Sequence, residues 1–212
     1  GKNGVDLEGY KNLVGTFAQP RFVVCDIALL ATLPDREFRA GLAEVVKAAI
    51  IGDTELFGLL EKVSFVELRK DNALLANVVE RAVRVKADIV AADERENGER
   101  RKLNLGHTLA HAIEKVAPQY THGEAVAIGL HRMAEAGCRM GLLGRDDAER
   151  IEALLDRYGF DTALPADMPS LCAAMRKDKK RAGGRLHLIV PAGIGSVCDC
   201  AMPLDEIEKL LY

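Results

Sequence analysis

This sequence of 212 residues has no long apolar run and little net charge. None of its hydrophobic stretches approaches the roughly 20 residues that a helix needs to cross a bilayer, so no membrane span is expected. The formal charge of -3 gives no general reason to expect nucleic acid or an anionic membrane as a partner. The length suits one sizeable core, or one domain with a piece of another.

A disulfide pattern is also lacking. The cysteines number five, an odd count without a disulfide-like framework, so a reducing cytoplasm is the expected location. Cys198 and Cys200 form a lone C-x-C in a strand-like stretch, and we interpret them as ordinary thiols rather than metal ligands.

The chain has no initiator methionine either. It opens with Gly1-Lys2-Asn3-Gly4, without a basic or an apolar leader region, so it does not resemble a signal peptide. These glycines are typical of the middle of a loop that begins upstream. We therefore expect a fragment of a longer protein.

Strand signals are sparse. Residues 1–20 are rich in Gly, Asn and Lys and end at Pro20, which predicts a loop. The apolar run 22–26 lies between Pro and Asp, and it predicts a short buried strand, the only clear one before the far C-terminus. Residues 186–191 and 196–200 flank Ala192-Gly193 and predict a small β-hairpin.

The remaining signals are helical. Pro34 suits a first turn, and Ser64 with Glu67 forms a capping box. Apolar residues recur every three or four positions between Leu74 and Ile89, which predicts an amphipathic helix. A mainly α fold is expected, with helices at 34–52, 53–60, 64 onward, 71 onward, 106 onward, 123–140, 146–158, 169–177 and 203–211, and a polar connection at 93–104.

Histidine is scarce but concentrated. His107 and His111 stand four positions apart on a predicted helix and share a face, and His122 follows in the segment Thr121-His122-Gly123-Glu124. Imidazole pairs of this kind bind zinc and similar cations, and catalytic sites commonly add one carboxylate. The alternative is two surface histidines and one near a helix start.

A carboxylate for such a site stands in the first long helix. Glu44 and Lys47 lie three positions apart, on a face that also carries the small residues Ala40, Gly41 and Ala48. Small residues around a charged pair suggest a face that packs closely or borders a cleft. An ordinary surface ion pair, worth at most about 1 kcal/mol, is the alternative.

Basic side chains recur in the same segments. Several cations at one site would suit a ligand with phosphate and carboxylate groups, although each alone is typical of a solvated surface. Lys86 is the most telling, because its helix is otherwise strongly apolar nearby. The set comprises Lys2, Lys11, Lys47, Lys86, Arg100, Arg101, Lys179 and Lys180.

In this order along the chain, several segments resemble the motifs of the 3-dehydroquinate synthase family. They are GKNG at 1–4, KNLVG at 11–15, LPDRE at 33–37, GLAEVVK at 41–47, KADIV at 86–90, DERE at 93–96, LNLGHT at 103–108 with His111, HGEAV at 122–126 and DKK at 178–180. These motifs are long and span nearly the whole chain, so a chance match is not a serious rival.

The resemblance implies a site for zinc or cobalt built from Glu44, His107 and His122. It implies proton-transfer or catalytic roles for His111, Glu96 and Lys47. It also implies substrate contacts from Lys2, Asn12, Lys86, Arg100, Asn104 and one of Lys179 or Lys180, and NAD contacts from Lys11, Leu29, Leu30, Ala31 and Thr32.

The family converts 3-deoxy-D-arabino-heptulosonate 7-phosphate into 3-dehydroquinate and phosphate with NAD, in the shikimate pathway. Residues 1–28 would be the tail of a nucleotide-binding domain (loop plus one strand), and residues 29–212 a helical metal- and substrate-binding domain. The rest of the nucleotide-binding region is absent, so the chain alone is expected to bind NAD weakly and to be inactive. Members of the family are commonly dimers, so a homodimer is expected.

Three rival interpretations remain. Other sugar-phosphate cyclases share the fold, but they tend to change the substrate-carboxylate contacts that are kept here. Metal-dependent polyol or alcohol dehydrogenases would lack this set of lysines. A helical module that binds metal only for stability would need a closed site with four protein ligands.

Overall fold

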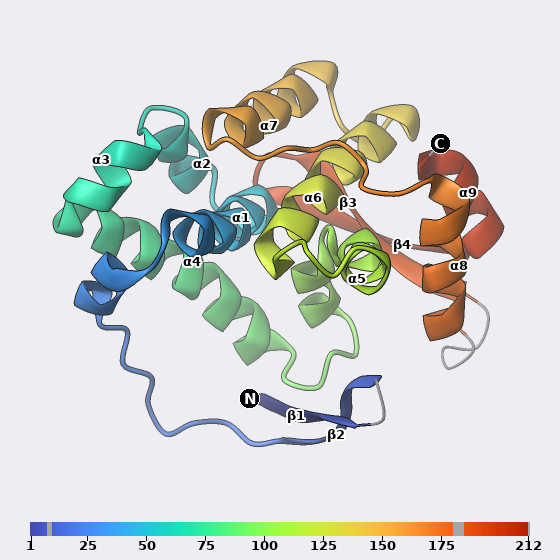
Figure 1. The fold of residues 1–212 in the computed structure, drawn as a ribbon, viewed down its shortest axis with the longest axis horizontal. Helices are drawn as coiled ribbons and strands as arrows, with labels where there is room; N and C mark the ends of the chain where they lie inside the picture. The colour runs from blue at the N-terminus through green and yellow to red at the C-terminus, as the bar shows by residue number, and fades with distance from the viewer. Residues whose placement is uncertain (8–9, 180–184, 212) are drawn as a thin grey trace.

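The computed structural model describes residues 1–7, 10–179 and 185–211, and of residues 6, 10–13, 177–179 and 185 it describes the backbone alone. The described part is mainly helical, as the sequence predicts (Figure 1). Its α-helices are α1 Asp35–Gly52, α2 Thr54–Leu60, α3 Phe65–Lys70, α4 Asn72–Ala92, α5 His107–Val116, α6 His122–Arg139, α7 Arg145–Arg157, α8 Met168–Lys179 and α9 Leu204–Leu211. Short 3₁₀ helices are η1 Ile27–Thr32 and η2 Glu99–Asn104, and the strands are β1 Lys2–Leu7, β2 Tyr10–Phe17, β3 Arg185–Gly193 and β4 Ser196–Pro203.

Helices α1 and α6 form the centre of the core. They pack on each other, with α2 and α4 beside α1, and α5 and α7 beside α6 (Figure 1). Small buried residues such as Ala43 in α1 and Ala127 in α6 let the two helix backbones approach. These two helices also carry Glu44 and His122, so core packing fixes the distance between the two side chains.

Local capping explains where the helices begin. Ser64 and Glu67 form the predicted capping box of α3, and the Asp53 carboxylate accepts from Leu56 N at 2.9 Å at the start of α2. Asp71 caps α4 in the same way. None of the helices in the described part of the chain is both long and apolar enough to cross a membrane.

The predicted C-terminal hairpin is confirmed. Strands β3 and β4 pair antiparallel, with Leu188 opposite Cys200. Leu188 and Val190 are buried, and β3 contacts α6, so the hairpin closes one side of the helical core.

The prediction of a loop over residues 1–20 is wrong. Strands β1 and β2 form an antiparallel hairpin in which Gly4 pairs with Gly15. A β-carbon on Gly15 would stand 2.2 Å from the Asn3 carbonyl oxygen, so here glycine permits close strand approach rather than a loop. The glycine-rich composition concealed this role.

The predicted buried strand at 22–26 is also wrong. This segment is extended but unpaired among the described strands. Its apolar residues are exposed, with Phe22 at 79%. An apolar run becomes a strand only where a neighbouring strand meets its backbone groups, and the described chain places none there. The segment and the β1–β2 hairpin instead run along the outside of the helical body (Figure 1).

Candidate functional site

On α1, Lys47 is buried beside Glu44, whose side chain is 39% exposed and lines a cleft. Lys47 is only 6% exposed, and its Nζ lies 2.7 Å from Glu44 Oε2. The alternative of an ordinary surface ion pair is therefore wrong. A buried ammonium needs a partner, and the Glu44 carboxylate supplies one.

Two glycines place His107. Gly106, in the left-handed conformation with φ 76°, precedes α5 and lies against α6, because a β-carbon on Gly129 would stand 2.2 Å from the Gly106 carbonyl oxygen. His107 is the first residue of α5, and its Nδ1 lies 3.0 Å from the Leu105 carbonyl oxygen. Since that oxygen can only accept, Nδ1 donates and Nε2 turns toward Glu44 Oε1, 3.5 Å away.

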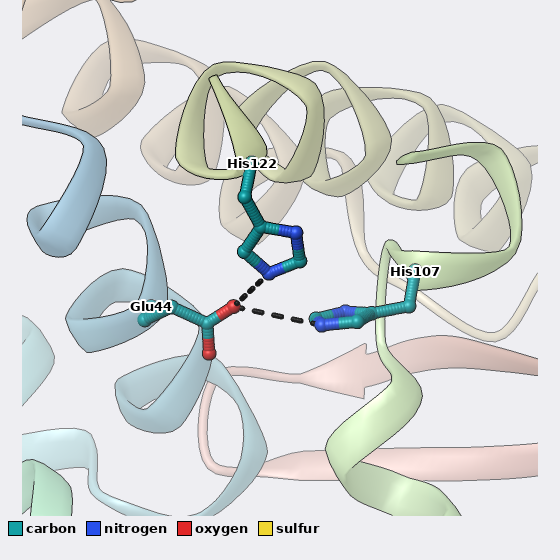
Figure 2. A group of neighbouring side chains, drawn as sticks. All are labelled: Glu44, His107 and His122. Carbon is teal, nitrogen blue, oxygen red and sulfur yellow. Dashed lines mark hydrogen bonds and ion pairs between the residues drawn. The ribbon is translucent and has the colours of Figure 1, made fainter. Parts of the chain in front are cut away.

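His122 reaches the same carboxylate from α6. It is the first residue of that helix, directly after Thr121, whose side chain forms a capping box with Glu124. Its Nε2 lies 3.2 Å from Glu44 Oε1, and its Nδ1 lies 3.2 Å from Glu114 Oε1. Figure 2 shows both imidazoles pointing at one carboxylate oxygen from two separate helices.

The donor set fits a divalent cation. One ligand atom from each of Glu44, His107 and His122 lies within 4.8 Å of the others. Two ligands about 2.1 Å from a tetrahedral zinc stand roughly 3.4 Å apart, close to the separations just given. With both Nδ1 atoms donating elsewhere, the two Nε2 atoms converge on one carboxylate oxygen, an arrangement that a metal ion or a proton satisfies.

Electrostatics act differently on the three members of this cluster: the pKa values of Glu44 and His107 are lowered, whereas the hydrogen bond to Glu44 raises the pKa of His122. Burial alone would raise the pKa of Glu44, but hydrogen bonds and charge from His122 and Lys47 hold it below its usual value. Burial, aided by the charge of Lys47, lowers the pKa of His107 to about 4. At neutral pH, Glu44 is thus ionised and His107 Nε2 carries a lone pair.

The cluster opens into a cleft of about 600 Å³. The lining includes four cations, namely Lys2, Lys47, Lys86 and Arg100, against the carboxylates of Glu44 and Glu96. Such a cleft attracts anionic ligands. Its apolar wall comes from Val45, Ala48, Val79, Ala82, Val83 and Leu103.

One turn-rich segment presents Glu96, predicted as a catalytic residue, and two of the predicted substrate residues, Arg100 and Asn104. Glu96, with φ 63°, accepts from Lys2 Nζ and from Asn104 Nδ2 at 2.6 Å. Arg100 is 7% exposed and donates to the Glu94 carbonyl oxygen. The structure therefore brings Glu96, Arg100 and Asn104 together in one cleft, and the roles that the resemblance implies for them stay predictions.

The other predicted residues lie elsewhere or outside the description. His111 is exposed and borders the cluster through the His107 ring, with centroids 5.5 Å apart, but it does not line the cleft. Leu29, Leu30, Ala31 and Thr32 form η1, away from the cleft lining. Lys11 and Asn12 in β2 and Lys179 in α8 have only their backbone described, and Lys180 lies outside the described residues.

Two residues at the site were missed by sequence reasoning. Glu114 contacts His122, and its spacing of seven from His107 on α5 was an available signal. Asp93 accepts from the backbone N of Asn97 (3.0 Å) and Gly98 (2.7 Å), and no spacing rule indicates this role.

The fold and site together define a class of protein: a helical domain with a Glu-His-His cluster suited to metal, set in a cationic cleft. The family model described as 3-dehydroquinate synthase C-terminal matches residues 41–181, and the one described as 3-dehydroquinate synthase N-terminal matches residues 1–40. The chain belongs to the 3-dehydroquinate synthase family.

Relatives support the same family. The chain is 47% identical to 3-dehydroquinate synthase of Halorhodospira halophila over 92% of its own length and 56% of that protein. It is 43% identical to that of Prochlorococcus marinus over 100% of its length and 58% of the relative. The chain thus spans little more than half of these relatives.

Solved structures share the fold at lower identity. A 2-epi-5-epi-valiolone synthase from Streptomyces hygroscopicus, solved with NAD+ and Zn2+, superposes with a TM-score of 0.87 at 29% identity, over 99% of this chain and 60% of that one. A 2-deoxy-scyllo-inosose synthase, complexed with carbaglucose-6-phosphate, NAD+ and Co2+, gives 0.85 at 27% identity, over 99% and 61%.

Proposed function

We propose that this chain carries the metal- and substrate-binding part of a 3-dehydroquinate synthase. The reaction would convert 3-deoxy-D-arabino-heptulosonate 7-phosphate into 3-dehydroquinate and phosphate. The observation that carries the proposal is the convergence of Glu44, His107 and His122 in a cleft with a surplus of cations. Such a cleft suits a substrate with carboxylate, phosphate and vicinal hydroxyl groups.

Glu44, His107 and His122 would hold zinc or cobalt, the metals named with the two structural relatives. A divalent ion there would polarise neighbouring substrate oxygens and ease loss of a hydroxyl proton. NAD would supply a transient oxidation that is reversed later in the same cycle.

The cleft cations would fix the charged ends of the substrate. Lys2, Lys86 and Arg100 reach it from three different elements, so they can hold two anionic groups at a set distance. Asn104 would add a neutral donor. Asn12 and one of Lys179 or Lys180 complete the proposed substrate set.

Three residues would handle protons or charge beside the reacting carbons. His111 borders His107 on the exposed side of α5, and Glu96 lies in the cleft between Lys2 and Asn104. Lys47, held beside Glu44, would stabilise negative charge that develops on the substrate.

Residues 1–28 would belong to the tail of a nucleotide-binding domain, and 29–212 to the metal and substrate domain. NAD contacts would come from Lys11 and from Leu29, Leu30, Ala31 and Thr32. A homodimer and a cytoplasmic location complete the proposal.

A second candidate is another sugar-phosphate cyclase, because both solved relatives named above make other rings. The identity is higher to the dehydroquinate synthases, at 47% against 29%. A structural metal module is disfavoured, because a closed zinc site takes four protein ligands. Among the described residues the cluster offers three.

The test measures zinc affinity by chelator competition in this chain and in Glu44→Gln, His107→Ala and His122→Ala. One tight zinc per chain, weakened at least tenfold by each change, supports the metal centre. Arg150→Ala, at a remote pair with Glu61, is the control. Unchanged affinity in all three variants would reject the assignment, whatever the reaction.

A second measurement addresses the substrate. Inorganic phosphate and a non-reactive phosphonate analogue of the heptulosonate substrate are titrated into the zinc-loaded chain. Binding of the analogue that weakens in Lys86→Met supports the dehydroquinate synthase assignment. Preference for a carboxylate-free cyclitol phosphate such as carbaglucose-6-phosphate would favour the alternative cyclase.

A further inference from the structure

Glu114 contacts the cluster formed by Glu44, His107 and His122 but is not one of its three candidate metal ligands. It lies on α5 seven positions after His107 and three after His111, so the three side chains share one helical face. Its side chain is 11% exposed, and Oε1 lies 3.2 Å from His122 Nδ1. A glutamate carboxylate that is buried to this extent is normally paired with a specific partner group.

His122 depends on such a partner more than His107 does. The His122 side chain is 46% exposed, against 14% for His107. Packing and the Leu105 carbonyl fix the His107 ring. Within the described part of the chain, the polar contacts of His122 are Glu44 on Nε2 and Glu114 on Nδ1, so loss of the second would leave Glu44 alone to hold the half-exposed ring.

The contact also selects which nitrogen is available. A carboxylate can only accept from a ring N–H, so Glu114 holds a proton on Nδ1 and leaves Nε2, the nitrogen that faces Glu44, as the one that can bind a metal. Without it, the neutral imidazole favours a proton on Nε2, because the Glu44 carboxylate accepts there. That tautomer cannot bind a metal through Nε2.

We propose that Glu114 is a positioning residue for the metal centre, orienting His122 and fixing its tautomer through Nδ1. The inference rests on the proposed metal-binding function. Carboxylates in this position raise the basicity of a ligating imidazole, and removing them typically weakens metal binding about 10- to 100-fold.

The experiment measures the zinc affinity of the full 212-residue chain by chelator competition. Glu114→Ala should weaken zinc binding about 10- to 100-fold. Glu114→Gln, which keeps an acceptor oxygen but loses the charge, should restore part of that loss. Glu135→Gln is the matched control, because Glu135 lies 3.9 Å from His131, a histidine outside the cluster, and its loss should leave zinc affinity unchanged.

A spectroscopic measurement separates orientation from general structure. In ¹H–¹⁵N spectra of the zinc-loaded chain, His122 should show a slowly exchanging Nδ1–H in the wild type and in Glu114→Gln. This signal should disappear in Glu114→Ala while the His107 Nδ1–H persists. Should Glu114→Ala fail to fold, Glu114→Gln carries the same test with a smaller loss of affinity.

The outcomes distinguish two failures. If His122→Ala weakens zinc binding but neither Glu114 variant changes affinity or the Nδ1–H signal, the inference about Glu114 is overturned and the metal centre stands. If His122→Ala and Glu44→Gln also leave zinc affinity unchanged, the proposed function fails first.

Discussion

Gly123 lies against the backbone of Ala40: a β-carbon built on this glycine would stand 2.0 Å from the Ala40 carbonyl oxygen. The contact joins the first turn of α6 to α1, one turn before Glu44. It is the close approach that brings His122, the neighbour of Gly123, within 3.2 Å of the Glu44 carboxylate. The glycine of the His-Gly pair thus has a packing role with a direct effect on the site.

Gly123→Ala should therefore move α6 away from α1. The added methyl meets backbone rather than a flexible side chain, so we expect a loss of about 1–3 kcal/mol in unfolding free energy. We also expect zinc affinity to fall at least tenfold. Gly58→Ala is the control, because nothing lies within 4 Å of a β-carbon there. Equal zinc affinity in both variants would contradict the role given to Gly123.

Asp93 shapes the segment that carries Glu96 and Arg100. Its carboxylate accepts from the backbone N of Asn97, Gly98 and Arg100, which holds Glu96 in its left-handed conformation. In Asp93→Ala we expect amide exchange at those three positions to accelerate at least about tenfold. Affinity for phosphate should fall, while zinc affinity stays unchanged.

Asp88→Ala provides the comparison for this prediction. Asp88 is an exposed aspartate on α4, so its loss should leave exchange in the 93–104 segment unaltered. Phosphate affinity that falls equally in both variants would point to net charge rather than to the shape of the segment. Unchanged exchange in Asp93→Ala would refute the capping role.

The sequence was sufficient to predict the helical body and the cluster. Capping residues such as Ser64 act over a few positions, and the long motifs around Glu44 and His107 predicted that they would meet. The role of Asp93 could not be predicted, because it depends on contacts with the folded backbone, whereas Glu114 could have been found from its spacing of seven from His107 on α5. The segment at 22–26 was misjudged because an apolar run does not show whether a neighbouring strand is present.

That exposed segment leads to a stability prediction. The side chains of Phe22 and Val24 are 79% and 77% exposed. The double variant Phe22→Ser/Val24→Ser should therefore change the unfolding free energy by less than about 0.5 kcal/mol. It should also reduce binding of a hydrophobic dye and concentration-dependent association. Phe57→Ala, at a fully buried position, should cost about 3–5 kcal/mol in the same urea titration. A large loss in the double variant would mean that 22–24 pack against the body in solution.

Tyr158 predicts how stability depends on alkaline pH. Its hydroxyl donates to the carbonyl oxygens of Leu60 at 3.1 Å and Val63 at 3.3 Å. Burial raises the pKa of Tyr158 from 10.0 to about 12. Because the folded pKa exceeds the unfolded one, this stabilisation is complete below pH 10 and is lost as pH rises toward 12. Linkage gives a loss on the order of 2–3 kcal/mol across that range.

Tyr158→Phe isolates this effect from other groups that titrate at high pH. At pH 8 the variant should be less stable than the wild type by about 1 kcal/mol, since two carbonyl groups lose their donor. As the pH rises above 10, only the wild type loses the Tyr158 contribution, so the difference should shrink and then reverse. Urea titrations of both proteins at several pH values measure this difference in unfolding free energy. A difference that stays constant across this range would show that the Tyr158 hydroxyl titrates alike in the folded and unfolded chain, and the hydrogen bonds to Leu60 and Val63 would then not hold its proton.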